Sequence, residues 1–290
     1  MNALDLVKLS PLMERTSGRA EVIVALIDGP VLMENADQWS ANIRHAISKV
    51  PAVCARAESA ACMHGTFVAG VLAARRGSGA VSICPGCTLL IHPIFAETDA
   101  RNGAMPSASP DALSEAIVSS IDAGARVLNL SVGLTDSGKG ENRLLQALDY
   151  AAARGVIPIV AAGNQATVGS SAITHHRWVV PVAACDGGGR PVEETNLGGS
   201  IARNGFRAPG VDIPSLAPDG TNRQFRGTSA AAPFVTGAVA LLWSEFPGAR
   251  AEQVRLALAS GYGGRTANVV PPLLNAWAAY ETLTRIAARS

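Results

Sequence analysis

Three side chains that could together activate a nucleophile stand where regular elements of the sequence are expected to begin or end. Asp28 follows an apolar run, His64 precedes a run with helical periodicity, and Ser229 opens a long apolar stretch behind a glycine. A serine becomes a nucleophile when a histidine takes its proton, and a carboxylate can hold that histidine in the required tautomer. The chemistry open to such a set is acyl transfer through a covalent intermediate.

Ser229 is the most informative of the three, because it lies in a glycine-led turn, residues 227–233 (GTSAAAP). A serine at the start of a helix often serves only as the N-cap. As a nucleophile it would instead benefit from the helix dipole and from free backbone N–H groups, and its small neighbours leave room for a substrate backbone. We expect Pro233 to lie in the first helical turn, where a proline removes no hydrogen bond.

The remaining polar candidates also have simpler explanations when each is taken alone. Asp28 could form a turn with Gly29 and Pro30, and His64 could cap the helix that it is expected to open. Asn164 follows a predicted strand, where it could satisfy a turn or donate a hydrogen bond to the oxyanion formed when Ser229 attacks a carbonyl. It is the combination that favours catalysis.

The elements that must position these residues alternate between apolar runs and amphipathic stretches. This alternation predicts an α/β fold with a mostly parallel central sheet and helices on both faces. We expect one domain over residues 1–290, with residues 1–18 as an N-terminal lead-in and an irregular stretch over 193–227. Strands are predicted at 21–27, 88–95, 127–130, 156–162 and 178–184, and helices at 64–74, 111–123, 141–154, from about 228, at 251–259 and at 273–287.

Charge and composition restrict the partners. The formal net charge of +1 gives no field that would attract nucleic acid or an anionic membrane, so neither partner is expected and small polar or peptidic substrates are the default. The longest apolar stretch, Ala230–Trp243, is too short to span a bilayer, and the first 30 residues lack the pattern of a secretory signal. A cytoplasmic location is therefore expected, with no cofactor.

The five cysteines form an odd set with several open explanations. Cys84 and Cys87 make a lone CxxC, whereas a zinc site would need a second pair or suitably spaced histidines, so no metal is expected. Cys54 and Cys62 could close a short loop just before His64. The sequence leaves open whether either pair is a disulfide.

Five motifs in order resemble the subtilase family of serine peptidases, and the likeness runs from about Glu21 to Tyr280. The resemblance implies a triad of Asp28, His64 and Ser229, with an oxyanion hole made by Asn164 and the Ser229 backbone N–H. The motifs are Asp28-Gly29-Pro30, His64-Gly65-Thr66, Asn129-Leu130-Ser131-Val132-Gly133, Ala161-Ala162-Gly163-Asn164 and Gly227-Thr228-Ser229-Ala230-Ala231-Ala232-Pro233.

The same resemblance implies where a peptide would bind. We expect an extended substrate backbone to pair along Asn129, Leu130, Ser131, Val132 and Gly133, with Ala161, Ala162 and Gly163 as the other wall of the pocket. Neither segment carries a charge, which favours an uncharged residue at the cut. The pocket floor, expected within Thr167–His176, is not readable from the sequence.

A narrower resemblance is to the subtilases that mature cyanobactins and process ribosomal precursor peptides. It is carried by Ile27-Asp28-Gly29-Pro30-Val31, by the Pro93-Ile94-Phe95 strand and by Leu134-Thr135-Asp136-Ser137-Gly138. The cyclising members carry an inserted helical element that has no clear counterpart here, so cleavage is favoured over a peptide ligase or macrocyclase. The chain departs from the wider family at Gly29, Phe67 and Ala230-Ala231, positions that bear on substrate preference.

Two other classes are weaker. A non-catalytic peptide-binding scaffold would be expected to have lost one of Asp28, His64, Asn164 or Ser229, and all four are present. A nucleotide-dependent enzyme on a similar sheet would need a glycine-rich phosphate loop after its first strand, where Asp28-Gly29-Pro30 stands instead.

Overall fold

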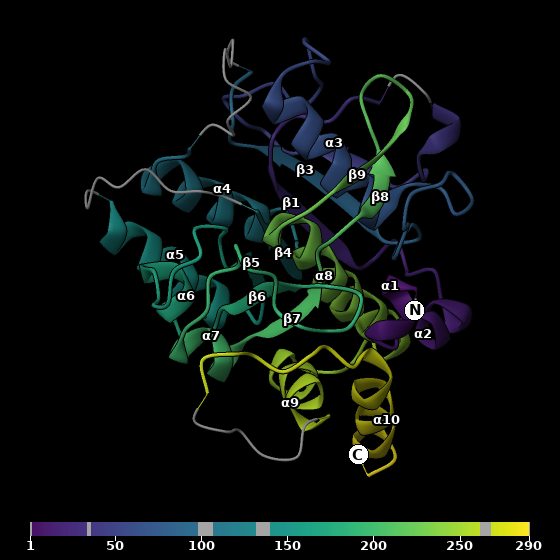
Figure 1. Ribbon diagram of the computed structural model, residues 1–290, viewed down its shortest axis with the longest axis vertical. Coiled ribbons are helices and arrows are strands. Elements are labelled where there is room, and N and C mark those ends of the chain that lie inside the picture. Colours follow the sequence, from purple (N-terminus) through teal and green to yellow (C-terminus); the bar gives the residue numbers. More distant parts are fainter. Residues whose placement is uncertain (1, 34–35, 98–106, 132–139, 262–267, 290) are drawn as a thin grey trace.

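A parallel sheet covered on both faces organises the computed structural model, which describes residues 2–33, 36–97, 107–131, 140–261 and 268–289 (Figure 1). Its seven described strands lie in the order β2-β3-β1-β4-β5-β6-β7, and every neighbouring pair is parallel. The predicted α/β class is confirmed. Their bounds are β1 (Ile23–Asp28), β2 (Ile43–His45), β3 (Thr88–Pro93), β4 (Val127–Leu130), β5 (Ile157–Ala161), β6 (Val180–Cys185) and β7 (Phe206–Pro209).

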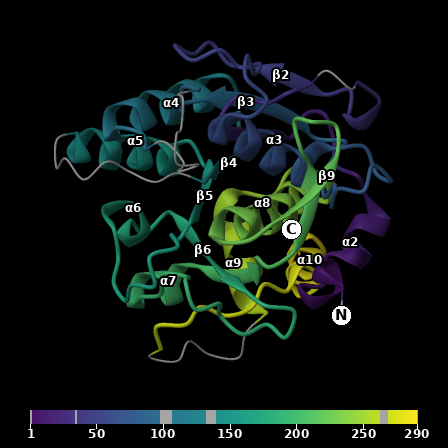
Figure 2. The ribbon, with the colours of Figure 1, turned by 45° about the horizontal axis from the view of Figure 1, so that its top comes forward.

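The central strands are apolar throughout because both of their faces are buried. In β1, Ala25 and Ile27 face one core, whereas Val24 and Leu26 face the other, as the two-residue period of a strand requires. The first core is closed by α4 (Pro110–Asp122) and α5 (Glu141–Ala153), and the second by α3 (Ala60–Ala73) and α8 (Thr228–Glu245). Figure 2 shows these two groups of helices on opposite sides of the sheet.

The stretch expected to be irregular, residues 193–227, contains regular elements, so that prediction is wrong. It holds α7 (Gly199–Asn204), β7, and a two-stranded antiparallel hairpin of β8 (Ile213–Leu216) and β9 (Asn222–Phe225). Each of these strands has only four residues, and three of the four residues of β9 are exposed. The sequence therefore has no apolar run from which these strands could be predicted. β2, with three residues, was missed for the same reason.

Two helices begin at positions that differ from the predicted ones. α3 starts at Ala60, because Ser59 is its N-cap and accepts a hydrogen bond from the Cys62 N–H. His64 is therefore inside the helix and does not cap it. α10 (Ala276–Ala287) begins later than predicted, after the N-cap Asn275. Further described helices are α6 (Ala172–His175), α9 (Ala251–Ser260) and the 3-10 turn Ala36–Gln38.

The N-terminal residues are part of the packed fold. They form α1 (Ala3–Leu6) and α2 (Ser10–Arg15), and α2 contacts α8 and α10. Val7, Leu9 and Leu12 are fully buried in the same core as α3 and α8. Within the described ranges, the structure has no helix that combines the length and the apolar character needed to cross a membrane.

Candidate active site

Asp28 and His64 are joined directly. The Nδ1 of His64 donates a hydrogen bond to the Oδ1 of Asp28 over 2.6 Å, and the same oxygen accepts the Gly29 N–H at 2.7 Å. Asp28 is fully buried as the last residue of β1, whereas the His64 side chain keeps 12% of its surface exposed. This bond fixes the tautomer in which Nε2 is free to accept a proton.

A close backbone approach seats the helix of His64 on the end of β1. A Cβ at Gly29 would lie 2.0 Å from the carbonyl oxygen of Ala61, and one at Gly65 would lie 2.4 Å from that of Pro30. Neither distance is compatible with a side chain, so both positions require glycine. The Thr66 hydroxyl adds a further link by accepting the Leu32 N–H at 2.9 Å.

The environment of His64 acts on its proton affinity in two directions. Burial of the imidazole disfavours its charged form, but the charge of Asp28 and the hydrogen bond to it outweigh this and raise the pKa of His64 above its ordinary value of 6.5. A base with a raised pKa accepts a proton more readily, and it is mostly neutral at a pH above that pKa. Oδ2 of Asp28 is buried and has no hydrogen-bond partner among the described residues.

Ser229 is half-buried in the first turn of α8, and α8 packs against α3, the helix of His64. The N-cap is Gly227, with φ of 106°, a conformation that favours glycine. Ser229 itself is therefore not the cap. The expectation for Pro233 is wrong, because it lies inside the helix and takes away the N–H that would have bonded to the Ser229 carbonyl.

Asn164 is held in one orientation by α8. Its Oδ1 accepts the backbone N–H of Thr228 at 2.9 Å, so its amide nitrogen remains the donor that points elsewhere. The Thr228 hydroxyl in turn accepts the Gly163 N–H at 3.2 Å. These two bonds connect the end of β5 to the start of α8. They place the amide donor of Asn164 near the backbone N–H of Ser229.

The expected substrate strand needs a correction at its first two residues. Asn129 and Leu130 are fully buried and belong to β4, whose backbone is paired with β1 and with β5. Asn129 points into the fold, where its Oδ1 accepts the Thr236 hydroxyl at 2.7 Å and its amide donates to Ser131 Oγ. A substrate backbone cannot pair along these residues, because their N–H and C=O groups already serve the sheet.

The rest of the expected substrate strand begins with Ser131, which is 5% exposed just after β4. Val132 and Gly133 lie outside the described residues. On the facing wall, Ala161 ends β5, the carbonyl of Ala162 accepts the Asn196 amide, and Gly163 bonds to Asn196 and to Thr228. The backbone groups of Ala162 and Gly163 named here are therefore already hydrogen-bonded, and these residues would contact a substrate mainly through their surface.

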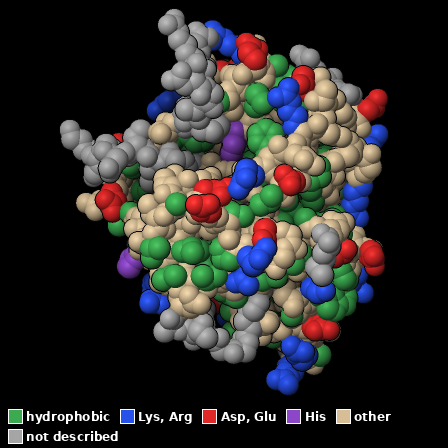
Figure 3. Space-filling view, viewed as in Figure 1, with side chains coloured by type: hydrophobic (Ala, Val, Ile, Leu, Met, Phe, Trp, Pro, Cys, Tyr) green, Lys and Arg blue, Asp and Glu red, His purple; other side chains and the backbone are tan. Residues whose placement is uncertain are grey.

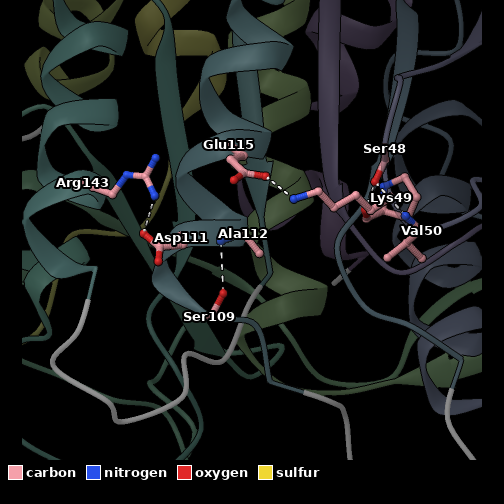
Figure 4. Close-up of polar contacts among 9 residues, drawn as sticks. Ser48, Lys49, Val50, Ser109, Asp111, Ala112, Glu115 and Arg143 are labelled. Carbon is pink, nitrogen blue, oxygen red and sulfur yellow. Dashed lines mark hydrogen bonds and ion pairs between the residues drawn. The ribbon is translucent and has the colours of Figure 1, made fainter.

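The helices beside this edge of the sheet are fixed by polar contacts at its carboxyl end (Figure 4). Ser109 caps α4 by accepting the Ala112 N–H at 3.1 Å, and Arg143 of α5 pairs with Asp111 of α4 at 3.1 Å. Lys49 pairs with Glu115 at 3.0 Å. Exposed ion pairs of this kind contribute little stability, about 0 to 1 kcal/mol each.

The structure resolves the open question about the cysteines. Cys54 and Cys62 form a disulfide, whereas Cys84, Cys87 and Cys185 are buried free thiols. Glu97 lies beside the disulfide and accepts the N–H groups of Ala55 and Arg56 and the Ser59 hydroxyl. Sequence patterns singled out neither Ser59 nor Glu97. The one available signal was that Ser59, a common N-cap residue type, stands a few positions before the helical run.

Two hollows in the described part of the chain differ in their relation to this site. One of about 870 Å³ is lined by the starts of β6 and β7 and by α7 and α9, at the opposite edge of the sheet from Asp28. A smaller one of about 450 Å³ is lined by Leu32, Trp39, Thr66 and residues 216–220, next to the helix of His64. Figure 3 shows a histidine side chain at the bottom of a depression on the viewed face.

Comparison with known proteins agrees with the geometry. A sequence model of the subtilase family matches residues 20–267. Subtilisin DY from Bacillus licheniformis is 32% identical over 206 residues, covering 68% of this chain and 69% of its own length. Fervidolysin from Fervidobacterium pennivorans is 33% identical over 218 residues, or 66% of this chain, but the match spans only 30% of fervidolysin.

Solved structures give the same result over more of the chain. A mutant of the protease domain of PatA is 29% identical, with a TM-score of 0.82, over 92% of this chain and 97% of that one. The prenylagaramide maturation protease PagA is 29% identical, with a TM-score of 0.79, over 96% of this chain and 98% of that one. The PatG macrocyclase domain, 21% identical with a TM-score of 0.82, shares the fold. The chain belongs to the subtilase family and is a subtilisin-like serine endopeptidase domain.

Proposed function

We propose that this domain cleaves peptide bonds with Ser229 as nucleophile and His64 as general base and acid. Asp28 orients His64 and stabilises its protonated form. The observation that carries the proposal is the 2.6 Å bond between Asp28 and His64, on a helix that packs against the helix of Ser229. Asn164 and the Ser229 backbone N–H form the oxyanion hole.

The proposed reaction has two steps. Nε2 of His64 takes the Ser229 proton as Oγ attacks the substrate carbonyl, and the negative oxygen is stabilised by the Asn164 amide and the Ser229 N–H. The protonated imidazole, stabilised by Asp28, then donates to the leaving amine, which departs and leaves an acyl-enzyme. Water, activated by His64, attacks the acyl-enzyme and releases the acid product.

The substrate that we propose is a peptide with an uncharged residue before the cut, such as a segment of a ribosomal precursor peptide. Support comes from the uncharged walls of Ser131 and of Ala161–Gly163, and from PagA and PatA, whose names describe maturation proteases. Hydrolysis is favoured over ring closure, since the likeness to the PatG macrocyclase extends to the fold alone. A cyclised product would differ from a hydrolysed one by the mass of one water.

The direct test is covalent labelling of the nucleophile. The domain is exposed to a fluorophosphonate, and its intact mass and labelled peptide are determined by mass spectrometry, with Ser229→Ala as the matched control. We expect a single adduct on Ser229 and none in the control. A folded protein without an adduct would contradict the catalytic proposal and would favour a peptide-binding role for the domain.

A further inference from the structure

The Cys54–Cys62 disulfide lies next to the catalytic pair in both sequence and space. Cys62 is in the first turn of α3, two residues before His64 on the same helix. Cys54 lies in a segment that pairs with Val31, three residues after Asp28, through the Val31 N–H to Ala52 O bond at 3.0 Å and the Cys54 N–H to Val31 O bond at 3.4 Å. One sulfur therefore belongs to the Asp28 side and the other to the His64 side.

These links close a ring through the catalytic hydrogen bond. From Asp28 the chain runs to Val31, across two backbone hydrogen bonds to the segment of Cys54, and over the disulfide to Cys62. It continues two residues along α3 to His64, and the 2.6 Å bond leads back to Asp28. The disulfide is the one covalent cross-link in this ring. A change at the sulfurs thus acts on the separation of Asp28 and His64.

A second set of contacts fixes the loop between the two cysteines and the first turn of α3. Glu97 accepts the N–H groups of Ala55 and Arg56 and the hydroxyl of Ser59, and the Ser59 oxygen accepts the Cys62 N–H as the cap of α3. Residues 55–58, which directly follow Cys54, are exposed. The two cysteines are only 8 residues apart, and a loop that short constrains the unfolded chain less than a long loop would.

We propose that Cys54 and Cys62 are positioning residues whose disulfide holds His64 against Asp28, so that reduction by a dithiol slows acylation of Ser229. The inference rests on the proposed triad. It assigns the disulfide a local effect on catalysis, distinct from any contribution to overall stability.

The redox step balances as an ordinary thiol–disulfide exchange. A thiolate of the dithiol attacks Sγ of Cys54, the bond to Sγ of Cys62 breaks, and Cys62 leaves as a thiolate that takes up a proton. The second thiol of the reductant then attacks the mixed disulfide and releases Cys54 as a thiol. Two electrons pass from the dithiol, which becomes a disulfide, to the pair, and oxidised glutathione reverses the change.

The size of the effect is limited by the links that remain. After reduction, α3 is still seated by the Gly29 and Gly65 approach and by the Leu32–Thr66 hydrogen bond. Since a misplacement of about 1 Å can cost roughly a hundredfold in rate, we expect a partial loss of about tenfold in the phosphonylation rate of Ser229.

The experiment compares one protein in two redox states. The fluorophosphonate labelling rate is measured for the oxidised domain, for the domain reduced with dithiothreitol, and after reoxidation with oxidised glutathione, with the state of each cysteine confirmed by mass spectrometry. A chelator is present throughout, because Cys54, Cys62 and Glu97 place their ligand atoms within 4.8 Å of one another and the freed thiols could bind Zn²⁺. The other three cysteines are already thiols.

The matched control is the double variant C54S/C62S, which should label at the slow rate whether or not the reductant is present. Its melting temperature is measured so that the rates refer to folded protein. Two further readouts separate positioning from a structural loss: the acid midpoint of the labelling rate should fall on reduction, and peptide affinity, measured with Ser229→Ala in both redox states, should not change.

The outcomes distinguish this inference from the proposed function. A slower rate and a lower acid midpoint on reduction, both restored by oxidation, support the disulfide as a positioning element. Equal rates in the two states overturn it and leave the triad intact. If the oxidised folded domain is not labelled at all, the triad proposal fails, and the inference fails with it.

Discussion

At the scale of single residues, this site depends on how each polar atom is already occupied. Asp28 gives one oxygen to both His64 and Gly29, and Asn164 gives its oxygen to the Thr228 N–H. The atoms left over, Nε2 of His64 and Nδ2 of Asn164, are those that the reaction needs. Buried or fixed partners therefore set the tautomer of the base and the orientation of the oxyanion donor before a substrate arrives.

The orientation of Asn164 leads to a quantitative prediction. Replacing it with Ala removes a donor that acts on the charge developed in the transition state, and loss of the equivalent donor in subtilisin costs roughly 3 to 4 kcal/mol. We expect kcat to fall about a hundred- to a thousandfold, with little change in KM. Steady-state kinetics on a chromogenic peptide measure both constants. A change in KM alone would show that Asn164 binds substrate and not the oxyanion.

The pH dependence follows from the raised pKa of His64. Burial lowers this pKa, but the charge of Asp28 and the hydrogen bond to it raise it by more. Only the neutral imidazole can take the Ser229 proton, so kcat/KM should fall as the pH drops through a midpoint above 6.5. In Asp28→Asn the midpoint should move to lower pH and the plateau should drop severely, because the charge and the tautomer are lost. A wild-type midpoint below 6.5 would contradict this.

At the scale of elements, the contact of α3 with the end of β1 decides the geometry of the catalytic pair. The two backbones approach so closely at Gly29 and Gly65 that neither position has room for a Cβ. Where many subtilases have a threonine beside the aspartate, Gly29 supplies no hydroxyl, and Oδ2 of Asp28 has no partner among the described side chains.

Gly29→Ala tests this contact. A Cβ placed 2.0 Å from the Ala61 carbonyl oxygen must push α3 away from β1, and His64 moves with it. We expect kcat/KM to fall by about a hundredfold, from a shift of about 1 Å, together with a lower melting temperature. The matched control is Gly199→Ala, since a Cβ there would meet no atom within 4 Å. Equal activity in the two variants would show that the approach does not position His64.

The same elements show what the sequence could and could not predict. Buried strands and long amphipathic helices were predicted within a few residues, because a strand covered on both faces must be apolar throughout. The start of α3, the helix and strands within 193–227 and the burial of Asn129 were not, since each depends on tertiary contacts. Ser59, the cap of α3, also bonds to Glu97, and Asn129 bonds to Thr236 of α8, and neither distant partner can be read from a local pattern.

At the scale of the whole molecule, the N-terminal helices connect the lead-in segment to the helix of Ser229. Leu9 and Leu12 are fully buried, and Arg15 of α2 forms an ion pair with Glu245 at the end of α8, at 3.0 Å. Arg15 also lies over the ring of Tyr280 in α10, 4.8 Å from its centre. The segment is thus core material on the same side of the sheet as α8, although no catalytic residue comes from it.

Leu12→Ala separates this structural role from catalysis. Removing a fully buried leucine side chain loses its transfer free energy and leaves a cavity, which should lower the free energy of unfolding by about 2 to 4 kcal/mol. Because the change falls at the far end of α8 from Ser229, the labelling rate of the protein that remains folded should match the wild type. Denaturant unfolding and fluorophosphonate labelling measure the two quantities on one preparation.

Leu256→Ala, at a side chain that is 61% exposed, is the matched control and should change neither the free energy of unfolding nor the labelling rate. A slower labelling rate in Leu12→Ala alone would contradict this separation. It would mean that the loss of packing around Leu12 displaces α8 along its length and alters the position of Ser229, so that the N-terminal helices help to position the nucleophile.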